Sequence, residues 1–228
     1  MAIFLDTGKI ELIEKYHAMG IIRGVTTNPT IMVRDGISGG LDGIKKHSIK
    51  IAELIHPYPL SVEVTNNNPE EMMNQALEFS KWAKNINIKI TIHGPNGELD
   101  NLRVIHELET QHNIRINGTA AMSAQQCFLA ALAGATYVSI FGGRANDMGY
   151  DSRAEISRLR NLLEECDLKS KIIVGSTREI INIIEWLEAG AHIVTVPPKL
   201  IDQMIVHPYT KETVQMFLKD GAKFEKSQ

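Results

Sequence analysis

The chain predicts an α/β fold that closes as a (β/α)₈ TIM barrel. Short strand-like segments alternate with amphipathic helical segments along its 228 residues. Strands that are joined through helices pair in parallel, and about eight such strands suffice to close a barrel. A chain of this length can form one barrel domain, and a doubly wound open sheet is the alternative for the same pattern.

The most regular strand covers residues 86–93, where isoleucines alternate strictly with Asn, Lys, Thr and His. Period two is typical of a β-strand because successive side chains point to opposite faces. The polar face carries Lys89 in mid-strand. If protein encloses this amine, lost hydration disfavours its charge and lowers its pKa, which makes it a candidate nucleophile toward a carbonyl. The alternative is a half-exposed strand with Lys89 in water.

The other strands are expected where short apolar or alternating runs are bounded by Gly, Pro or Asn. Alternation is clear at residues 60–65, where Leu, Val and Val alternate with Ser, Glu and Thr. The expected strands are residues 3–7, 21–27, 60–65, 86–93, 114–117, 136–142, 171–175 and 192–196.

Helices are expected where apolar residues recur at a spacing of three and four and Gly or Pro marks an end. Pro69, which follows three asparagines, suits a first helical turn. Residues 36–43 are expected to form a loop or a helix entry, and residues 209–228 a C-terminal helix and tail. The expected helices are residues 9–19, 44–55, 70–84, 96–112, 123–133, 152–166, 177–189, 199–205 and 209–218.

The composition is that of an ordinary soluble protein, with 43% hydrophobic and 22% charged residues and a formal net charge of −3. There is no basic excess for nucleic acid and no polybasic or spanning segment for a membrane. The N-terminus lacks the basic region of a signal peptide. Cys127 and Cys166 are expected to be reduced, packed thiols of a cytoplasmic protein. The histidines lack metal-site spacing, so neither a metal nor a cofactor is expected.

Several strands carry polar residues where a barrel strand should be apolar on both faces. If the apolar set faces the helices, these polar groups converge at the C-terminal mouth, where such barrels have their active sites. One such group could be a satisfied core residue, but a set that includes acids, a lysine and an arginine favours a site. The set is Asp6, Asn28, Glu63, Lys89, Asn117, Thr119, Ser139, Phe141, Ser176 and Arg178.

The residue types in this set suit carbonyl chemistry on a sugar. Lys89 could attack a ketone, and Glu63 on the neighbouring strand could move protons through a water molecule. Asp6 could accept a hydrogen bond from a sugar hydroxyl and hold that hydroxyl for carbon–carbon cleavage.

Two arginines follow the sixth and seventh strands. Arg144 ends the sequence Gly-Gly-Arg, and Arg178 ends the sequence Gly-Ser-Thr-Arg. Together with Ser176 and backbone amides at a helix start, they suit a phosphate group. The alternative for each arginine is a solvated surface charge.

Five segments of the sequence form recognisable motifs. They are residues 4–7, 24–30, 88–90 and 118–126, and residues 133–139 with Phe141 and Arg144. In these motifs the chain resembles the transaldolase family over nearly its whole length. The motif at residues 24–30, Gly-Val-Thr-Thr-Asn-Pro-Thr, is specific to that family among barrels. The compact length resembles the small subfamily that includes the fructose-6-phosphate aldolases.

The resemblance implies a cofactor-independent class I mechanism with Lys89 as the Schiff-base residue for a ketose phosphate. It also implies a homo-oligomer, because small members of the family form rings of five or pairs of such rings. The further roles that it implies are cleavage for Asp6, water positioning for Glu63 and Thr119, dihydroxyacetone binding for Asn28, Asn117 and Ser139, and phosphate binding for Arg144, Ser176 and Arg178.

Two matched positions bear on the reaction. The aldolases have Gln where this chain has Glu63 and Tyr where it has Phe141, whereas transaldolases have Glu and Phe. A tyrosine hydroxyl can protonate the bound carbanion and release dihydroxyacetone, and phenylalanine cannot. The expected function is therefore a transaldolase that moves dihydroxyacetone from fructose 6-phosphate or sedoheptulose 7-phosphate to an aldose phosphate. An aldolase that releases dihydroxyacetone and a catalytically lapsed sugar-phosphate-binding barrel are the alternatives.

Three residues depart from the family pattern. Thr91 and Ile140 stand where the family usually has proline, and Thr177 stands where it commonly has phenylalanine. These positions are expected near the mouth. They leave the Schiff-base residues in place and bear on the choice of acceptor sugar.

Overall fold

The computed structural model describes residues 1–225 and shows a closed barrel of eight parallel strands. Neighbouring strands pair in chain order, and the last strand returns to pair with the first. The predicted (β/α)₈ barrel is thereby confirmed, and the open doubly wound sheet is wrong. The strands are β1 (Ala2–Asp6), β2 (Val25–Thr26), β3 (Leu60–Glu63), β4 (Ile86–Thr91), β5 (Ile116–Ala121), β6 (Tyr137–Ile140), β7 (Lys171–Val174) and β8 (Ile193–Val196).

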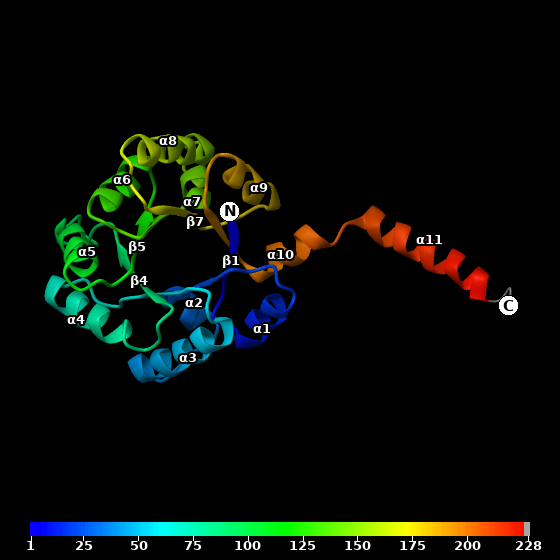
Figure 1. Cartoon of the computed structure of the whole chain (residues 1–228), viewed down its shortest axis with the longest axis horizontal. Coiled ribbons are helices and arrows are strands. Elements are labelled where there is room, and N and C mark those ends of the chain that lie inside the picture. Colours follow the sequence, from blue (N-terminus) through cyan, green and yellow to red (C-terminus); the bar gives the residue numbers. More distant parts are fainter. Residues whose placement is uncertain (226–228) are drawn as a thin grey trace.

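Helices surround the barrel on its outside, and the C-terminal helix extends away from it (Figure 1). The helices are α1 (Ile10–Ala18), α2 (Pro29–Arg34), α3 (Gly40–Ile55), α4 (Pro69–Phe79), α5 (Asp100–Thr110), α6 (Ala124–Leu132), α7 (Gly142–Asp147), α8 (Ser152–Glu165), α9 (Ile180–Glu188), α10 (Pro198–Ile205) and α11 (Pro208–Glu225).

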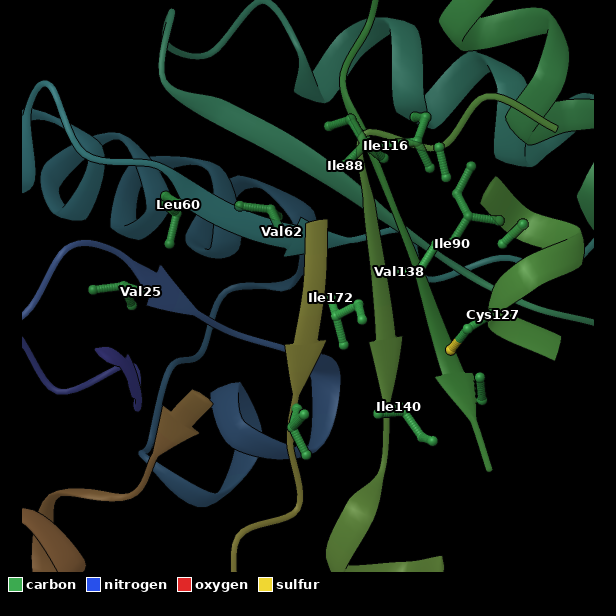
Figure 2. Packing of buried hydrophobic residues seen from close by; sticks show 14 of the residues in the cluster. Val25, Leu60, Val62, Ile88, Ile90, Ile116, Cys127, Val138, Ile140 and Ile172 are labelled. Atoms are coloured by element: carbon green, nitrogen blue, oxygen red, sulfur yellow. The ribbon is translucent and has the colours of Figure 1, made fainter. Parts of the chain in front are cut away.

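The main hydrophobic core lies between the sheet and this ring of helices. Val62, Ile88, Ile90 and other apolar side chains of the strands point outward into it (Figure 2). Ile88 and Ile90 are fully buried. Because side chains alternate along a strand, the burial of this apolar set against the helices turns the polar set of β4 into the barrel. The orientation expected from the sequence is therefore correct.

A second, smaller apolar cluster fills the lower interior of the barrel. It consists of Phe4, Tyr137, Ile173 and Ile193, and all four are buried. Gly24 makes room for it, since a Cβ there would lie 2.7 Å from the Phe4 ring. This cluster, called the floor below, closes the barrel toward the N-terminal ends of its strands.

Two short helices, α2 and α7, follow β2 and β6 directly and were missed in the sequence. Asn28 accepts a hydrogen bond from the Ile31 amide (2.8 Å), and Pro29 occupies the first turn, so α2 starts directly after β2. Each helix has only six residues, too few to show a helical period.

Most element boundaries differ from the expected ones by a few residues, and β2, β5 and α4 show clear differences. β2 is limited to residues 25–26, and β5 begins at Ile116 but continues to Ala121. α4 ends at Phe79 rather than at residue 84. Turn hydrogen bonds take over there, since the Lys81 and Trp82 amides donate to the Glu78 and Phe79 carbonyls.

The predicted C-terminal helix is present and longer than expected, and it stands away from the barrel as α11 (Figure 1). Its large apolar side chains are exposed, including Tyr209, Val214, Phe217 and Leu218. The predicted tail at residues 226–228 lies outside the described residues. In the described part of the chain, no helix is both long and apolar enough to span a membrane.

Both cysteines are free thiols, but only one of them is packed. Cys127 is buried under the sheet (Figure 2), and burial raises the pKa of its thiol. Cys166 is exposed at the end of α8, so the expectation that it packs is wrong. Helix α8 turns its apolar residues Ile156, Leu159 and Leu163 inward and leaves its C-cap in solvent.

Candidate active site

A cavity of about 330 Å³ lies at the C-terminal ends of the strands. It is lined by every residue that the sequence assigned to the site except Glu63, whose carboxylate contacts the lining residue Lys89. A larger groove of about 890 Å³ runs outside the mouth between Leu12 and Pro198 and carries none of those residues. The predicted residues in the cavity are Asp6, Asn28, Lys89, Asn117, Thr119, Ser139, Phe141, Arg144, Ser176 and Arg178.

Lys89 lies on the inner face of β4 and is only 5% exposed, so the alternative of a lysine in water is wrong. Its Nζ donates to the Thr27 carbonyl (3.0 Å) and lies 3.0 Å from Glu63 Oε2. The register of β3 and β4 sets Glu63 directly opposite Lys89. A proton acceptor therefore contacts the amine through the pairing of two strands rather than through a flexible loop.

Asp6 is the last residue of β1 and lines the cavity. Thr26 Oγ1 donates to Asp6 Oδ1 (2.7 Å) and lies 2.5 Å from Thr195 Oγ1, so hydroxyls from β2 and β8 fix the carboxylate. Burial raises the pKa of Asp6, while the Thr26 hydrogen bond and the charges of Lys89 and Arg34 act in the opposite direction. The carboxylate is thus a buried base held by its neighbours.

Strands β5 and β6 supply a connected set of polar groups. Ser139 Oγ donates to Asn117 Oδ1 (2.6 Å), and Asn117 Nδ2 donates to Ser61 Oγ at 3.4 Å. Thr119 Oγ1 is buried and has no hydrogen-bond partner among the described residues. A buried hydroxyl without a partner on a cavity wall is a natural binding site for water or a ligand oxygen.

A β-bulge shapes this end of β5. Its pairing with β6 shifts between Gly118 and Ala121, and Ala120 has a φ of 60°. A non-glycine residue with positive φ is strained, and such strain is concentrated at functional sites. Thr119 has no partner on the β6 side of the bulge but stays in register with Thr91 of β4, so β5 extends beyond the strand end expected from the sequence.

Asn28 reaches the cavity from the β2–α2 junction. Its Oδ1 is engaged as the cap of α2, through the hydrogen bond from the Ile31 amide. Its Nδ2 makes no hydrogen bond to the described residues, so this amide can donate to a ligand.

The two arginines meet on the β6–β7 side of the cavity. The Arg144 guanidinium lies 5.1 Å from the centroid of the Phe141 ring, a cation–π arrangement that holds it over the wall. Arg178 Nη2 donates to Asp147 Oδ2 (2.8 Å), so an ion pair fixes its position. Both arginines are exposed, but each contacts a neighbouring side chain.

Backbone geometry brings these arginines and Ser176 together. A Cβ on Gly143 would lie 1.8 Å from the Ser176 carbonyl oxygen, so only glycine allows α7 to approach the loop after β7 this closely. Ser176 itself has a φ of 61°. Cationic side chains beside a serine hydroxyl suit an anionic oxygen cluster such as phosphate.

Several lining residues were missed in the sequence. Thr26 and Thr195 occupy inward positions of strands whose polar alternation could have revealed them. Arg34 gave no signal, because it lies on the missed helix α2. The missed residues of the cavity are Thr26, Thr30, Ile31, Arg34, Ile173, Gly175 and Thr195.

The three departures from the family pattern have separate environments. Thr91 Oγ1 donates to the His93 carbonyl (3.0 Å), and Thr177 Oγ1 donates to the Thr195 carbonyl (2.8 Å), so both threonines fix loops at the mouth. Ile140 instead packs outward in the core between sheet and helices (Figure 2). It therefore does not reach the cavity.

Comparison with known proteins places the chain among enzymes of one family. Residues 3–228 match the family described as Transaldolase/Fructose-6-phosphate aldolase. A "Probable transaldolase" of Carboxydothermus hydrogenoformans is 41% identical over 220 residues, which cover 96% of this chain and 97% of that protein. A "Probable transaldolase 2" of Listeria monocytogenes is 36% identical over 228 residues, covering 100% of this chain and 99% of the other.

Solved structures of other proteins share the fold at low identity. Thiamine phosphate pyrophosphorylase from Pyrococcus furiosus superposes with a TM-score of 0.60 at 10% identity, over 86% of this chain and 85% of that one. A soluble mutant of (S)-mandelate dehydrogenase from Pseudomonas putida gives a TM-score of 0.58 at 11% identity, over 88% of this chain and 67% of that one. These similarities concern the barrel alone.

Proposed function

The chain belongs to the transaldolase/fructose-6-phosphate aldolase family, and on that premise we propose that it transfers dihydroxyacetone through a Schiff base on Lys89. The donor is a ketose phosphate, such as fructose 6-phosphate or sedoheptulose 7-phosphate, and the acceptor is an aldose phosphate. The reaction belongs to carbohydrate metabolism in the cytoplasm. The observation that carries the proposal is the buried Lys89, which lines the same cavity as Asp6 and pairs with the Glu63 carboxylate at 3.0 Å.

The first stage forms the Schiff base. Lys89 passes a proton to Glu63, and its neutral amine attacks the C2 carbonyl of the ketose to give a carbinolamine. Glu63 then returns a proton to the departing hydroxyl through a water molecule, which leaves an iminium ion on Lys89. The unpartnered Thr119 hydroxyl supports this stage, because it can hold that water beside the pair.

The second stage breaks the bond between C3 and C4. Asp6 accepts the proton of the C4 hydroxyl, and C4 with its oxygen becomes an aldehyde group. The electron pair of the C3–C4 bond moves toward the iminium and forms an enamine. The aldose phosphate then leaves, and an acceptor aldehyde takes its place. Reversal of the same steps forms the new bond, and hydrolysis frees the product from Lys89.

Substrate binding follows from the remaining walls. Asn28, Asn117 and Ser139 offer amide and hydroxyl groups to the dihydroxyacetone part near Lys89. Arg144, Ser176 and Arg178 hold the phosphate on the β6–β7 side. Two observations support this assignment. All six side chains line one cavity. All of them except Asn28 belong to the adjacent strands β5, β6 and β7 or to the segments that directly follow β6 and β7.

Transfer is favoured over release because of Phe141. Its ring lines the cavity and offers packing but no proton, so the enamine waits for an aldehyde instead of being protonated. The test is product analysis with fructose 6-phosphate, with and without erythrose 4-phosphate. We expect rapid product formation only when the acceptor is present. Fast release of dihydroxyacetone without acceptor would assign the chain to the aldolase branch.

The Phe141→Tyr variant tests the same point from the other side. A phenol over the enamine should raise the rate of dihydroxyacetone release, while transfer falls or is unchanged. Phe141→Leu is the matched control, because it changes the packing without adding a hydroxyl. An equal rise in release in both variants would mean that water entry, rather than an acid, controls the branch.

Borohydride trapping separates both enzymes from a lapsed binding barrel. Reduction in the presence of fructose 6-phosphate should add a dihydroxyacetone-derived mass to the peptide that contains Lys89. A label on another lysine, or no label, would overturn the Schiff-base assignment. Binding of the sugar phosphate without any label would favour the lapsed barrel.

The quaternary state is a further part of the proposal. An isolated helix in water is marginal, and the 18 residues of α11 expose Val214, Phe217 and Leu218. A second copy that packs on this helix would bury them, which agrees with a pentamer or decamer. Light scattering should therefore give a multiple of the 25.4 kDa chain mass. Phe217→Ser should lower that mass, Lys219→Ser should not, and a monomeric wild type would refute the assembly.

A further inference from the structure

Arg34, the last residue of α2, lines the catalytic cavity, although nothing in the proposed chemistry uses it. It follows β2, whereas Arg144 and Arg178 follow β6 and β7. In a closed barrel of eight strands, β2 and β6 are four strands apart and lie across the barrel from one another. Arg34 is thus separate from the arginines assigned to the phosphate and stands on the opposite wall.

A buried carboxylate holds the Arg34 side chain in place. Arg34 Nε donates to Asp35 Oδ1 (2.9 Å) and Nη2 donates to Asp35 Oδ2 (3.3 Å), which is a two-pronged contact. The Asp35 side chain is 3% exposed and also accepts hydrogen bonds from Thr7 Oγ1 and the Gly8 amide, each at 2.8 Å.

Asp35 is therefore an ionised anchor rather than a mobile surface acid. Burial acts to raise its pKa, but hydrogen bonds from Arg34, Gly8 and Thr7 lower it below its usual value. Thr7 and Gly8 directly follow Asp6 in the chain, so the anchor ties α2 to the end of β1. The position of the Arg34 charge is in this way fixed relative to the Asp6 carboxylate.

The charged groups that face Asp6 are few. They are Lys89 from β4, Arg34 from α2 and Asp35 from the end of α2, while Glu63 is paired with Lys89. A guanidinium has five N–H groups, and Arg34 uses two of them on Asp35. The other three make no hydrogen bond to the described residues, so the guanidinium is not neutralised by further partners.

The charge of the Lys89 nitrogen changes repeatedly during the proposed reaction. It is cationic as an ammonium, neutral when it attacks, cationic as an iminium and neutral again as an enamine. Arg34 stays protonated throughout, since a guanidinium does not lose its proton in proteins. Asp6 therefore has one variable and one constant positive neighbour.

We propose that Arg34 is a positioning residue that supplies the constant positive charge facing Asp6, and that Asp35 fixes it there. This inference rests on the proposed function, because it takes Asp6 as the group that accepts the hydroxyl proton. Arg34 acts through Asp6 and keeps it in the charged form that can accept that proton. It is not an additional ligand of the phosphate.

The test is the pH profile of kcat/KM for transfer in the wild type, Arg34→Gln, Arg34→Lys and Lys9→Gln. Removal of a nearby positive charge disfavours a carboxylate, so Arg34→Gln should move the acidic limb to higher pH. At a fixed pH on the acidic limb, we expect kcat/KM to fall about three- to tenfold, where tenfold corresponds to a shift of one pH unit. On the plateau, kcat/KM should change little. Arg34→Lys keeps the charge and should restore the wild-type limb.

Lys9→Gln is the matched control, because Lys9 lines the outer groove beside Arg34 and its loss changes the net charge equally. An unmoved limb in Arg34→Gln would overturn the inference, as would an equal shift in Lys9→Gln. A rise in KM confined to phosphorylated sugars, at every pH, would instead make Arg34 a phosphate ligand. Thermal melts check folding, and Arg34→Met replaces the glutamine variant if that variant unfolds.

Borohydride trapping distinguishes this inference from the proposed function. Schiff-base formation needs Lys89 but does not need the cleavage base, so Arg34→Gln should be trapped like the wild type at neutral pH. If the wild type is neither trapped nor active, the proposed function fails and the Arg34 inference fails with it. If trapping and transfer are intact but the limb stays in place, the Arg34 inference alone is wrong.

Discussion

The barrel interior changes from apolar to polar within two residues of a strand. Asp6, Ser139, Gly175 and Thr195 line the cavity of the candidate active site. Two residues earlier on the same strand faces stand the floor residues Phe4, Tyr137, Ile173 and Ile193. Both layers are inward-facing positions of β1, β6, β7 and β8, with Gly175 directly after β7 and Ile173 at the border of the two layers, so the contrast lies mainly in side-chain chemistry.

Burial of side chains affects the stability of the two layers in different ways. The floor removes apolar surface from water, which favours folding. The mouth buries polar groups, which costs stability unless they are paired, and its groups are paired mainly with one another, as Ser139 is with Asn117. We therefore expect changes at the mouth to cost activity with little stability, and changes at the floor to do the reverse.

The largest effect should come from Lys89→Met at the mouth. It removes the proposed nucleophile but keeps an unbranched apolar stem, so turnover should fall by about 10⁴-fold or more while the fold is kept. Lys171→Met, an exposed lysine beside the floor, is the control and should retain activity. Transfer assays and thermal melts measure both properties, and residual transfer in Lys89→Met near the wild-type rate would end the Schiff-base proposal.

A smaller loss of activity should follow from Arg144→Ala at the mouth. Truncation of a charged hydrogen-bond donor costs about 1.5–3 kcal/mol, so KM for phosphorylated sugars should rise about ten- to 150-fold. Arg178→Ala should act in the same direction, although it also frees Asp147 from an ion pair. Steady-state kinetics on phosphorylated and unphosphorylated sugars measures the effect, and an equal loss on both substrates would contradict the phosphate role.

Gly24→Ala tests the floor. The new Cβ would lie 2.7 Å from the Phe4 ring, so the floor must repack at a cost of about 1–3 kcal/mol. The melting temperature should fall while kcat/KM stays close to wild type. Gly221→Ala on α11 is the control, because nothing lies within 4 Å of its Cβ position. A loss of activity without loss of stability in Gly24→Ala would show that the two layers are not independent.

The barrel and most residues of the cavity wall could be predicted from the sequence for the same reason. Period two at residues 60–63 and 86–91 separates the outward from the inward side chains, and a parallel barrel brings all inward polar groups to one mouth. The same alternation predicts that Lys89 and Glu63 lie on the inner faces of neighbouring strands, and the register of β3 and β4 sets them opposite each other. The resemblance to a family added the expected roles.

The short helices, Arg34 and the β-bulge could not be predicted, because they depend on features that leave no periodic pattern in the sequence. Helices α2 and α7 have six residues each and hide in loop-like sequence, so Arg34 could not be placed. The bulge in β5 lies in backbone dihedrals at Ala120 and not in residue type.

The smallest expected effect is a pH dependence of stability at the floor, carried by His192. This residue precedes β8, and its Nδ1 accepts a hydrogen bond from the Ile172 amide (3.0 Å), a bond that protonation of Nδ1 would break. Burial, then the charges of Arg160 and Lys171, lower its pKa to about 4.

The unfolded chain binds a proton at His192 near the ordinary histidine pKa of about 6.5, whereas the folded chain does so only near 4. Stability should therefore be full above about pH 6.5 and decline as the pH falls toward about 4. His192→Gln should flatten the melting temperature across this window, while the exposed control His112→Gln should not. Because the side chain is only partly enclosed, solvent screening keeps the effect modest.

Transfer activity on the plateau should be the same in both variants, since His192 contacts the floor opening and not the mouth. A loss of transfer in His192→Gln at constant stability would mean that the floor also shapes the catalytic layer above it.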